Sequence, residues 1–214
     1  ADRLLAPTAG GSVLPARPGI HDWVAVLDYR SLYPSIIRTF RIDPLSLVPD
    51  ATSRRTEELN AGAAGTAVGA AEGTTAGEDA FVTAPNGARF LLEGGILPGI
   101  LDRLFPERER LRREGDSIGA TAVKLLMNSF YGVLATPRCR FYSPETANAI
   151  TGFGQQILRW TRESIEAGGR GVLYGDTDSI FVALRAGEAA SAESEARDLA
   201  ARTTAALTAH LHAA

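Results

Sequence analysis

Two acidic segments, each placed directly after a short run of strand-forming apolar residues, constrain the fold of this chain more than any other feature. Asp28 ends the run V-A-V-L-D, and Asp176 and Asp178 lie in L-Y-G-D-T-D-S-I-F-V. The apolar runs are too short for helices and fit buried strands, so we expect the carboxylates at the rim of a sheet. Carboxylates facing one another there repel unless cations lie between them. Mg²⁺ suits such a place because it takes one or two carboxylates and leaves its other positions to water and phosphate.

The second acidic segment is predicted to form a β-hairpin. Residues 172–174 and 180–184 would be its strands, and residues 175–179 its tip. Asp, Gly, Ser and Thr also fill hairpin tips for turn chemistry alone, and for an isolated D-T-D this alternative stays open. The Tyr-Gly pair before the acids and the second acidic strand end elsewhere in the chain favour a metal site. A pair of ions held there can clamp both the attacking and the leaving oxygen of a phosphoryl transfer.

A tight turn is expected between Asp28 and a following helix. Pro34 fixes its own φ and disfavours the helical region for Tyr33, so the helix is predicted to begin at Pro34. The backbone N–H groups of the turn, from Ser31 and Leu32 in particular, are suited to a polyphosphate beside the metals. The alternative is that Leu32 and Tyr33 are ordinary core residues.

A third pattern lies in K-L-L-M-N-S-F-Y-G. Lys124, Asn128 and Tyr131 are spaced so that they share one face of a helix, separate from its apolar face. Upstream, Arg108 and Arg112 stand four residues apart, and two guanidinium groups with an ammonium can grip a triphosphate. Arginines and acids alternate through residues 102–114, however, so this segment is equally explained as a solvated helix whose charges pair with one another.

Three stretches, D-Y-R-S-L-Y-P-S, K-L-L-M-N-S-F-Y-G and Y-G-D-T-D-S, occur in that order. They resemble motifs A, B and C of family B DNA polymerases, and most closely those of the bacterial DNA polymerase II branch. The resemblance implies a template-directed polymerase core that transfers a nucleotide from a deoxynucleoside triphosphate to a primer 3′-hydroxyl. It also implies two bound Mg²⁺ ions, for which Mn²⁺ can substitute.

The resemblance further implies a role for each matching residue. Asp28 and Asp178, with the Tyr29 carbonyl, are similar to the metal ligands, and Asp176 to a nearby acid whose direct ligation is left open. The nucleotide-binding residues of the family are matched by Ser31, Leu32, Tyr33, Arg108, Arg112, Lys124 and Asn128. Lys124 is also similar to a catalytic residue. Those similar to the template and primer contacts are Gly10, Gly11, Tyr131, Gly132, Tyr174 and Thr177.

We expect an α+β fold in which a small antiparallel sheet is backed by helices. Residues 1–96 would form the N-terminal part of the palm with a flexible insertion at about 51–80, rich in Ala, Gly and Thr. Residues 97–134 would form a helical-hairpin fingers subdomain, and residues 135–214 the rest of the palm with a terminal helix. An exonuclease and a thumb are expected to be absent.

Primer–template DNA and deoxynucleoside triphosphates are the partners that the resemblance implies, with a sliding clamp bound through regions outside this chain. The lone Cys139 excludes an internal disulfide, and the sequence shows no apolar run of membrane-spanning length and no secretory signal, so a cytoplasmic, nucleoid-associated protein of a bacterium is predicted. The net charge of −3 predicts weak DNA affinity for this chain by itself. Two other functions stay open: an inactive or non-catalytic polymerase fragment, and a palm-type nucleotidyl cyclase.

Overall fold

The computed structural model describes residues 10–49 and 81–213, which group into two compact units. The first unit holds residues 34–49 and 81–150, and the second holds residues 10–33 and 151–213. Both boundaries fall inside continuous helices, after Tyr33 in α1 (Leu32–Thr39) and after Ile150 in α5 (Pro144–Ala167). The expected insertion at 51–80 lies outside the described residues.

The second unit is built on a four-stranded antiparallel sheet with the strand order β1-β6-β7-β2. Its strands are β1 (Val13–Leu14), β2 (Val24–Asp28), β6 (Val172–Asp176) and β7 (Ser179–Ala183). The hairpin β6–β7 occupies the centre, and β2 pairs with β7 along its whole length, from Val24 opposite Ala183 to Asp28 opposite Ser179. The first acidic segment is therefore a direct neighbour of the second.

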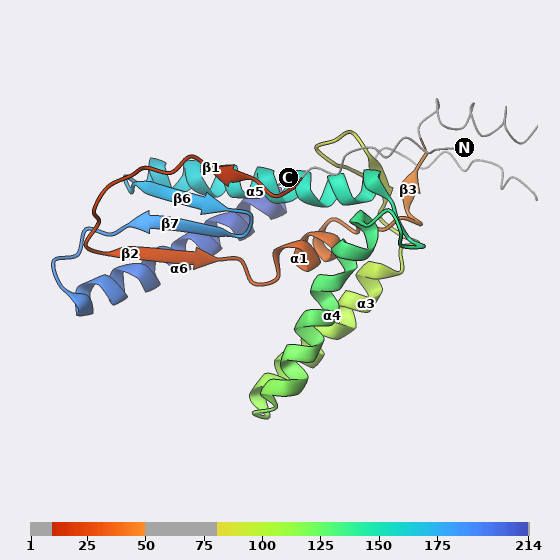
Figure 1. Ribbon diagram of the computed structural model, residues 1–214, viewed down its shortest axis with the longest axis horizontal. Helices are drawn as coiled ribbons and strands as arrows, with labels where there is room; N and C mark the ends of the chain where they lie inside the picture. Colours follow the sequence, from red (N-terminus) through yellow and green to blue (C-terminus); the bar gives the residue numbers. More distant parts are fainter. Residues whose placement is uncertain (1–9, 50–80, 214) are drawn as a thin grey trace, which may run out of the picture. The chain divides into compact units, whose positions relative to one another are not determined.

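Helices cover one face of this sheet. α5 and α6 (Ala189–Ala213) lie behind the strands in Figure 1. Along β2, Ala25 is buried while Val24 and Val26 are 39% and 56% exposed, so successive side chains alternate between a covered and an open face. The core between sheet and helices contains Leu14, Leu158, Ile165, Val172, Ile180, Val182 and Leu199.

The first unit contains a helical hairpin and a small sheet. α3 (Leu97–Arg113) and α4 (Ser117–Ala135) pack against each other, and β3 (Leu47–Val48), β5 (Arg89–Leu91) and β4 (Phe81–Thr83) form an antiparallel sheet in that order. Gly115, at φ 78°, makes the turn between the helices, where its missing Cβ permits the left-handed conformation. Asp116 then caps α4 by accepting a 2.8 Å hydrogen bond from the Gly119 N–H.

The α+β class, the helical hairpin and the terminal helix agree with the sequence-based predictions, but two boundaries were wrong. α1 begins at Leu32 rather than Pro34. A proline in the first turn of a helix loses no intrahelical bond, because the N–H groups there have no partner within the helix, and this outweighs the bias against a helical Tyr33. The β6–β7 strands also run further than expected, to Asp176 and Ser179, so only Thr177 and Asp178 form the turn.

We expected no apolar run of membrane-spanning length, but α4 has the length and hydropathy of one. Within residues 10–49 and 81–213 it is the one helix long and apolar enough to cross a membrane. A single helix of this kind is weak evidence for a membrane span. Here α4 packs along α3 and carries exposed Lys124 and Asn128 near its middle.

Candidate active site

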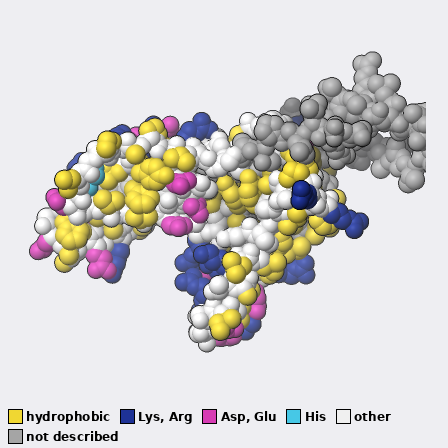
Figure 2. Space-filling view, viewed as in Figure 1, with side chains coloured by type: hydrophobic (Ala, Val, Ile, Leu, Met, Phe, Trp, Pro, Cys, Tyr) yellow, Lys and Arg dark blue, Asp and Glu magenta, His cyan; other side chains and the backbone are white. Residues whose placement is uncertain are grey.

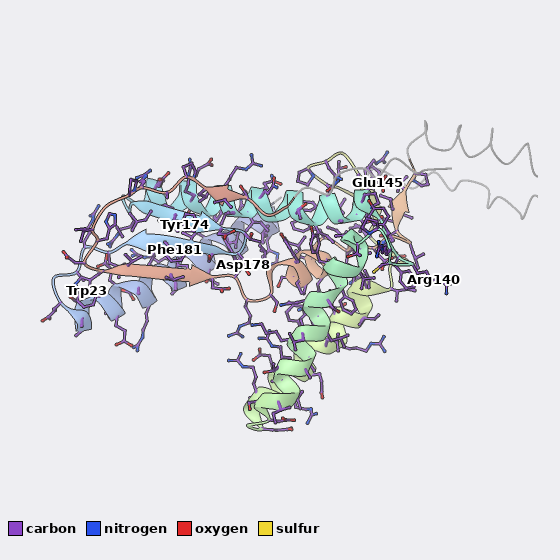
Figure 3. All side chains as sticks on the ribbon, in the orientation of Figure 1. Trp23, Arg140, Glu145, Tyr174, Asp178 and Phe181 are labelled. Carbon is purple, nitrogen blue, oxygen red and sulfur yellow. The ribbon has the colours of Figure 1, made fainter. Side chains whose placement is uncertain are left out.

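Both acidic segments lie at one end of the four-stranded sheet. Asp28 is the last residue of β2 and pairs with Ser179, and the Tyr29 N–H donates a 2.8 Å hydrogen bond to the Asp178 carbonyl. Ser179 also pairs with Asp176 across the hairpin, so Asp28, Ser179 and Asp176 form one row across three strands. Figure 3 shows Asp178 at the tip of the hairpin, beside the end of β2.

The alternation along β2 separates Asp28 from its neighbour Tyr29. Leu27 and Tyr29 pack on the covered face of the sheet, whereas the Asp28 side chain is exposed on the open face. The Tyr29 hydroxyl donates a 2.5 Å hydrogen bond to Thr161 Oγ1, a buried hydroxyl of α5. Burial raises the pKa of the Tyr29 phenol, and this hydrogen bond offsets the rise in part. Tyr29 thus fastens the end of β2 to α5 while Asp28 faces away from the helices.

The open face of the sheet is apolar along its length and acidic at one end. Figure 2 shows hydrophobic side chains over this face and acidic ones gathered at its end. Val13, Val24 and Val26 are among its exposed residues. Tyr174 and Phe181, paired across β6 and β7, have their ring centres 5.6 Å apart (Figure 3). The carboxylates are therefore concentrated at the sheet rim, where the sequence predicted them.

Asp176 is engaged within its own hairpin. Thr177 Oγ1 donates to its Oδ1 at 2.9 Å, and the Tyr174 hydroxyl donates to its Oδ2 at 3.4 Å. Thr177 adopts a φ of 51°, which gives the hairpin its tight two-residue tip. Both oxygens of Asp176 thus have hydroxyl donors. Asp28 and Asp178 are exposed residues.

The donor set at this end fits a hard cation. Within the described part of the chain, no three His, Cys, Asp or Glu side chains are grouped so that they could hold a metal ion by themselves. Magnesium does not need such a group, because one or two carboxylates with water and substrate phosphate complete its octahedron. Asp28 and Asp178, on adjacent backbone segments joined by the Tyr29 hydrogen bond, meet that smaller requirement.

The turn after Asp28 is compact and partly buried. Ser31 has a φ of 56°, in the left-handed region, which makes the sharp bend from β2 into α1. Leu32 is 7% exposed and Tyr33 is half-buried. Leu32 is thus a core residue, as its alternative interpretation held, and any contact it makes with a ligand has to come from its backbone.

The Gly10-Gly11 pair lies against the second acidic segment. The Thr177 N–H donates a 2.9 Å hydrogen bond to the Ser12 carbonyl, and a Cβ on Gly11 would overlap the Thr177 side chain. The Gly10 carbonyl accepts a 2.9 Å hydrogen bond from Gln155 of α5. Gly11 therefore has a structural reason to be glycine, the close approach of β1 to the hairpin tip.

The polar residues predicted on one helix face belong to the first unit. On α4, Lys124 and Asn128 are exposed and Tyr131 is half-buried, with the pKa of its phenol raised by burial. Gly132, the next residue, is exposed. The apolar face behaves as predicted, since Met127 and Leu134 are buried.

Some arginines of α3 pair with acids of the same segment, and another is half-buried. Arg110 bonds to Glu107 and Glu114, and these partners raise its pKa. Arg112 lies 3.3 Å from Glu109 in an exposed ion pair, while Arg108 is half-buried. The self-paired interpretation therefore holds for Arg110 and, through a weak surface pair, for Arg112.

Two residues of the site were given no role from the sequence. Thr161, the partner of Tyr29, sits in the middle of α5 and carried no signal, and Ser179, the last residue of Y-G-D-T-D-S, joins Asp28 and Asp176 in one row. Strand register could have identified Ser179 once β2 was paired with β7. Thr161 required the helix to be packed on the sheet.

A small antiparallel sheet, backed by two helices and acidic at the tip of its central hairpin, makes the second unit an α+β domain. The model of DNA polymerase family B matches residues 6–212. DNA polymerase II of Escherichia coli K12 is 43% identical over 176 residues, which cover 82% of this chain and 20% of the relative. DNA polymerase 2 of Aeropyrum pernix is 34% identical over 188 residues, covering 81% of this chain and 21% of the relative.

A solved structure agrees with these sequence matches. The family B DNA polymerase of the archaeon Pyrobaculum calidifontis superposes with a TM-score of 0.61 at 28% identity, covering 87% of this chain and 23% of that one. The chain belongs to DNA polymerase family B, and its resemblance to the bacterial DNA polymerase II branch is confirmed. It spans about a fifth of the length of these relatives.

Proposed function

We propose that this chain is the palm and fingers part of a DNA-directed DNA polymerase, which joins deoxynucleotides to a primer 3′-hydroxyl as the template directs. The observation that carries the proposal is the hydrogen bond from the Tyr29 N–H to the Asp178 carbonyl, because it makes the ends of two distant acidic segments neighbours. Family membership supports the same reaction. The three-part division into palm, fingers and palm belongs to this proposal.

Asp28 and Asp178 would hold two Mg²⁺ ions, together with the Tyr29 carbonyl. When bound, these ions lower the pKa of the primer hydroxyl and neutralise charge on the departing pyrophosphate. Asp176 would support these ligands rather than bind the ions directly, since both its oxygens already accept hydroxyl hydrogen bonds. Its part in the proposal is to keep the hairpin tip in shape.

The nucleotide would be bound mainly by cations and backbone donors. Lys124, Arg108 and Arg112 would grip the triphosphate, and the turn at Ser31 and Leu32 would contribute N–H groups. Exposed Lys124 supports this role more strongly than Arg112, which already pairs with Glu109. The proposed grip therefore rests first on Lys124.

The sugar and bases would meet the remaining proposed residues. Tyr33 would lie under the incoming sugar, and Asn128 with Tyr131 and Gly132 beneath the new base pair. Tyr174, Thr177 and the Gly10-Gly11 pair would face the primer and template. Such positioning and electrostatics, rather than covalent chemistry by the protein, account for catalysis in phosphoryl transfer.

Single-nucleotide primer extension by the full-length polymerase that contains this chain tests the proposal. Asp178→Ala should lower the incorporation rate by roughly 10²–10³-fold or more, because a group that stabilises the transition state is lost. Asp22→Ala, an exposed acid just before the opposite end of β2, is the matched control and should keep the wild-type rate. A folded Asp178→Ala protein with wild-type incorporation would exclude the metal assignment, and a cyclic nucleotide product without primer extension would indicate a cyclase.

A further inference from the structure

Asp43 is a buried acid in the segment that follows α1. It is 1% exposed, and its carboxylate accepts three backbone hydrogen bonds. Oδ1 accepts from the Leu45 N–H at 2.7 Å, and Oδ2 accepts from the N–H groups of Ile96 and Leu97 at 2.8 and 2.6 Å. The last two donors belong to the start of α3, which lies 53 and 54 positions further along the chain.

The start of α3 has no cap of its own. Ile96 occupies the N-cap position and makes no side-chain cap bond, and Gly94 and Gly95 precede it. Helix N-termini leave backbone N–H groups without partners inside the helix, and a nearby carboxylate also interacts favourably with the helix dipole. Asp43 supplies this missing cap from another part of the chain. A Cβ on Gly95 would lie 2.9 Å from the Asp43 Cβ, so the glycine permits the close approach.

A second connection between the same segments is weaker. Arg38 and Arg41 donate to Asp102 of α3 at 2.7 and 3.1 Å, and the hydrogen bond from Arg38 is the main cause of the lowered pKa of the Asp102 carboxyl. These side chains are 35–45% exposed, and exposed ion pairs contribute little. A buried carboxylate with three donors contributes more, because removing it leaves three partly buried N–H groups without this acceptor. Asp43 is therefore the principal anchor.

We propose that Asp43 is a positioning residue for nucleotide binding, which acts by fixing the base of the α3–α4 hairpin. The inference rests on the proposed function, since α3 and α4 carry Arg108 and Lys124 of the proposed triphosphate grip. Asp43 touches no substrate in this scheme. It holds the hairpin base on the segment that begins with α1, directly after the turn that follows Asp28.

Asp43→Ala in the full-length polymerase tests the inference. It removes both carboxylate oxygens, so the N–H groups of Leu45, Ile96 and Leu97 all lose their acceptor. KM for the deoxynucleotide should rise about tenfold, because a loosened hairpin base places Lys124 and Arg108 less well; this rise lies within the free energy of the lost charge-assisted hydrogen bonds. KM for primer–template should stay unchanged. A purely structural loss would lower only the active fraction, so an unchanged nucleotide KM would overturn the inference.

Asp116→Ala is the matched control, because it removes a cap from the other helix of the same hairpin. Asp116 caps α4 locally and is exposed, so its loss should leave the nucleotide KM at the wild-type value. A rise equal to that of Asp43→Ala would overturn the inference, since any loosening of the hairpin would then suffice.

Amide hydrogen exchange provides a readout that does not depend on activity. Asp43→Ala should speed exchange at Leu45, Ile96 and Leu97, whereas Asp116→Ala should speed it at Gly119 only. Unchanged exchange at Ile96 and Leu97 would overturn the anchor itself. A wild-type protein that extends no primer, with exchange as expected, would refute the proposed function and the nucleotide-binding role while leaving the anchor supported.

Discussion

At the scale of single residues, Tyr29 joins the site to the core. Its backbone N–H bonds to the Asp178 carbonyl and its hydroxyl bonds to Thr161, so one residue connects β2 to both the hairpin tip and α5. Thr161 is buried, and a buried hydroxyl without a partner is costly. The position of Asp28 therefore depends on a bond made on the opposite face of the sheet.

Tyr29→Phe should lower the free energy of unfolding by about 1–2 kcal/mol, because it removes one hydrogen bond and leaves the Thr161 hydroxyl buried alone. Urea titration followed by circular dichroism measures this change. Thr161→Val removes the same bond, and the double variant should cost little more than either single one. Fully additive losses would show that the two side chains do not interact.

The same residue predicts how stability depends on pH. Burial raises the pKa of Tyr29 in the folded state above the unfolded value of about 10. As the pH rises, the Tyr29 phenol therefore ionises first in the unfolded chain. The contribution of Tyr29 to the free energy of unfolding is complete below about pH 10 and is lost above it. The stability difference between wild type and Tyr29→Phe should stay constant up to about pH 9 and shrink as the pH rises above about 10. A difference that grows over this range would contradict the assigned sign.

At the scale of elements, β1 and the hairpin tip depend on each other. Thr177 bonds through its N–H to Ser12 and through its hydroxyl to Asp176, and it lies directly against Gly11. The two-residue strand β1 thus supports the turn that presents Asp178. A disturbance at Gly11 should reach the carboxylates through Thr177.

Gly11→Ala should destabilise the chain by about 1–3 kcal/mol, the usual cost of overpacking, because its Cβ would overlap Thr177. Thermal unfolding measures the loss. Gly10→Ala is the control, since a Cβ there would have no neighbour within 4 Å, and it should change stability by no more than about 0.5 kcal/mol. Equal effects of the two substitutions would refute the close approach as the cause.

Sequence patterns predicted elements well where the signal was local. The existence of β2, the apolar face of α4 with Met127 and Leu134, and the hairpin around Asp178 all follow from neighbours in the chain. β2 was expected to be buried, but Val24 and Val26 are exposed because one face of the sheet is open. The two acidic strand ends also lie at one end of the sheet, as expected. The first turn of α1 was misjudged at Pro34, because a rule about the preceding residue is a bias that the start of a helix can override.

Long-range contacts could not be predicted in this way. Asp43 caps α3 from 53 positions away, and no local pattern marks an acid as the cap of a distant helix. The Tyr29–Thr161 bond has the same character, since it depends on the packing of α5 on the sheet. Such residues become identifiable only when the elements are packed.

At the scale of the whole molecule, the chain divides into two compact units that separate the proposed functions. The carboxylates Asp28 and Asp178 lie in one unit, and the proposed triphosphate-binding residues Lys124 and Arg108 in the other. α1 and α5 run through the unit boundaries, so the two parts are joined by continuous helices. Family B membership applies to both, because the matched region extends over residues 6–212.

The charge of the whole chain predicts its behaviour toward DNA. A net charge of −3 gives little neutralisation of phosphates, and the acids at the sheet rim repel DNA when no cation is bound. A filter-binding titration of the folded 214-residue chain at physiological salt should give a duplex Kd weaker than about 10⁻⁵ M. Replacing Asp28 and Asp178 by Asn changes the charge from −3 to −1 (−3 + 2) and should tighten binding. Nanomolar binding by the unmodified chain would show instead that its arginines form a concentrated DNA-binding surface, which net charge alone conceals.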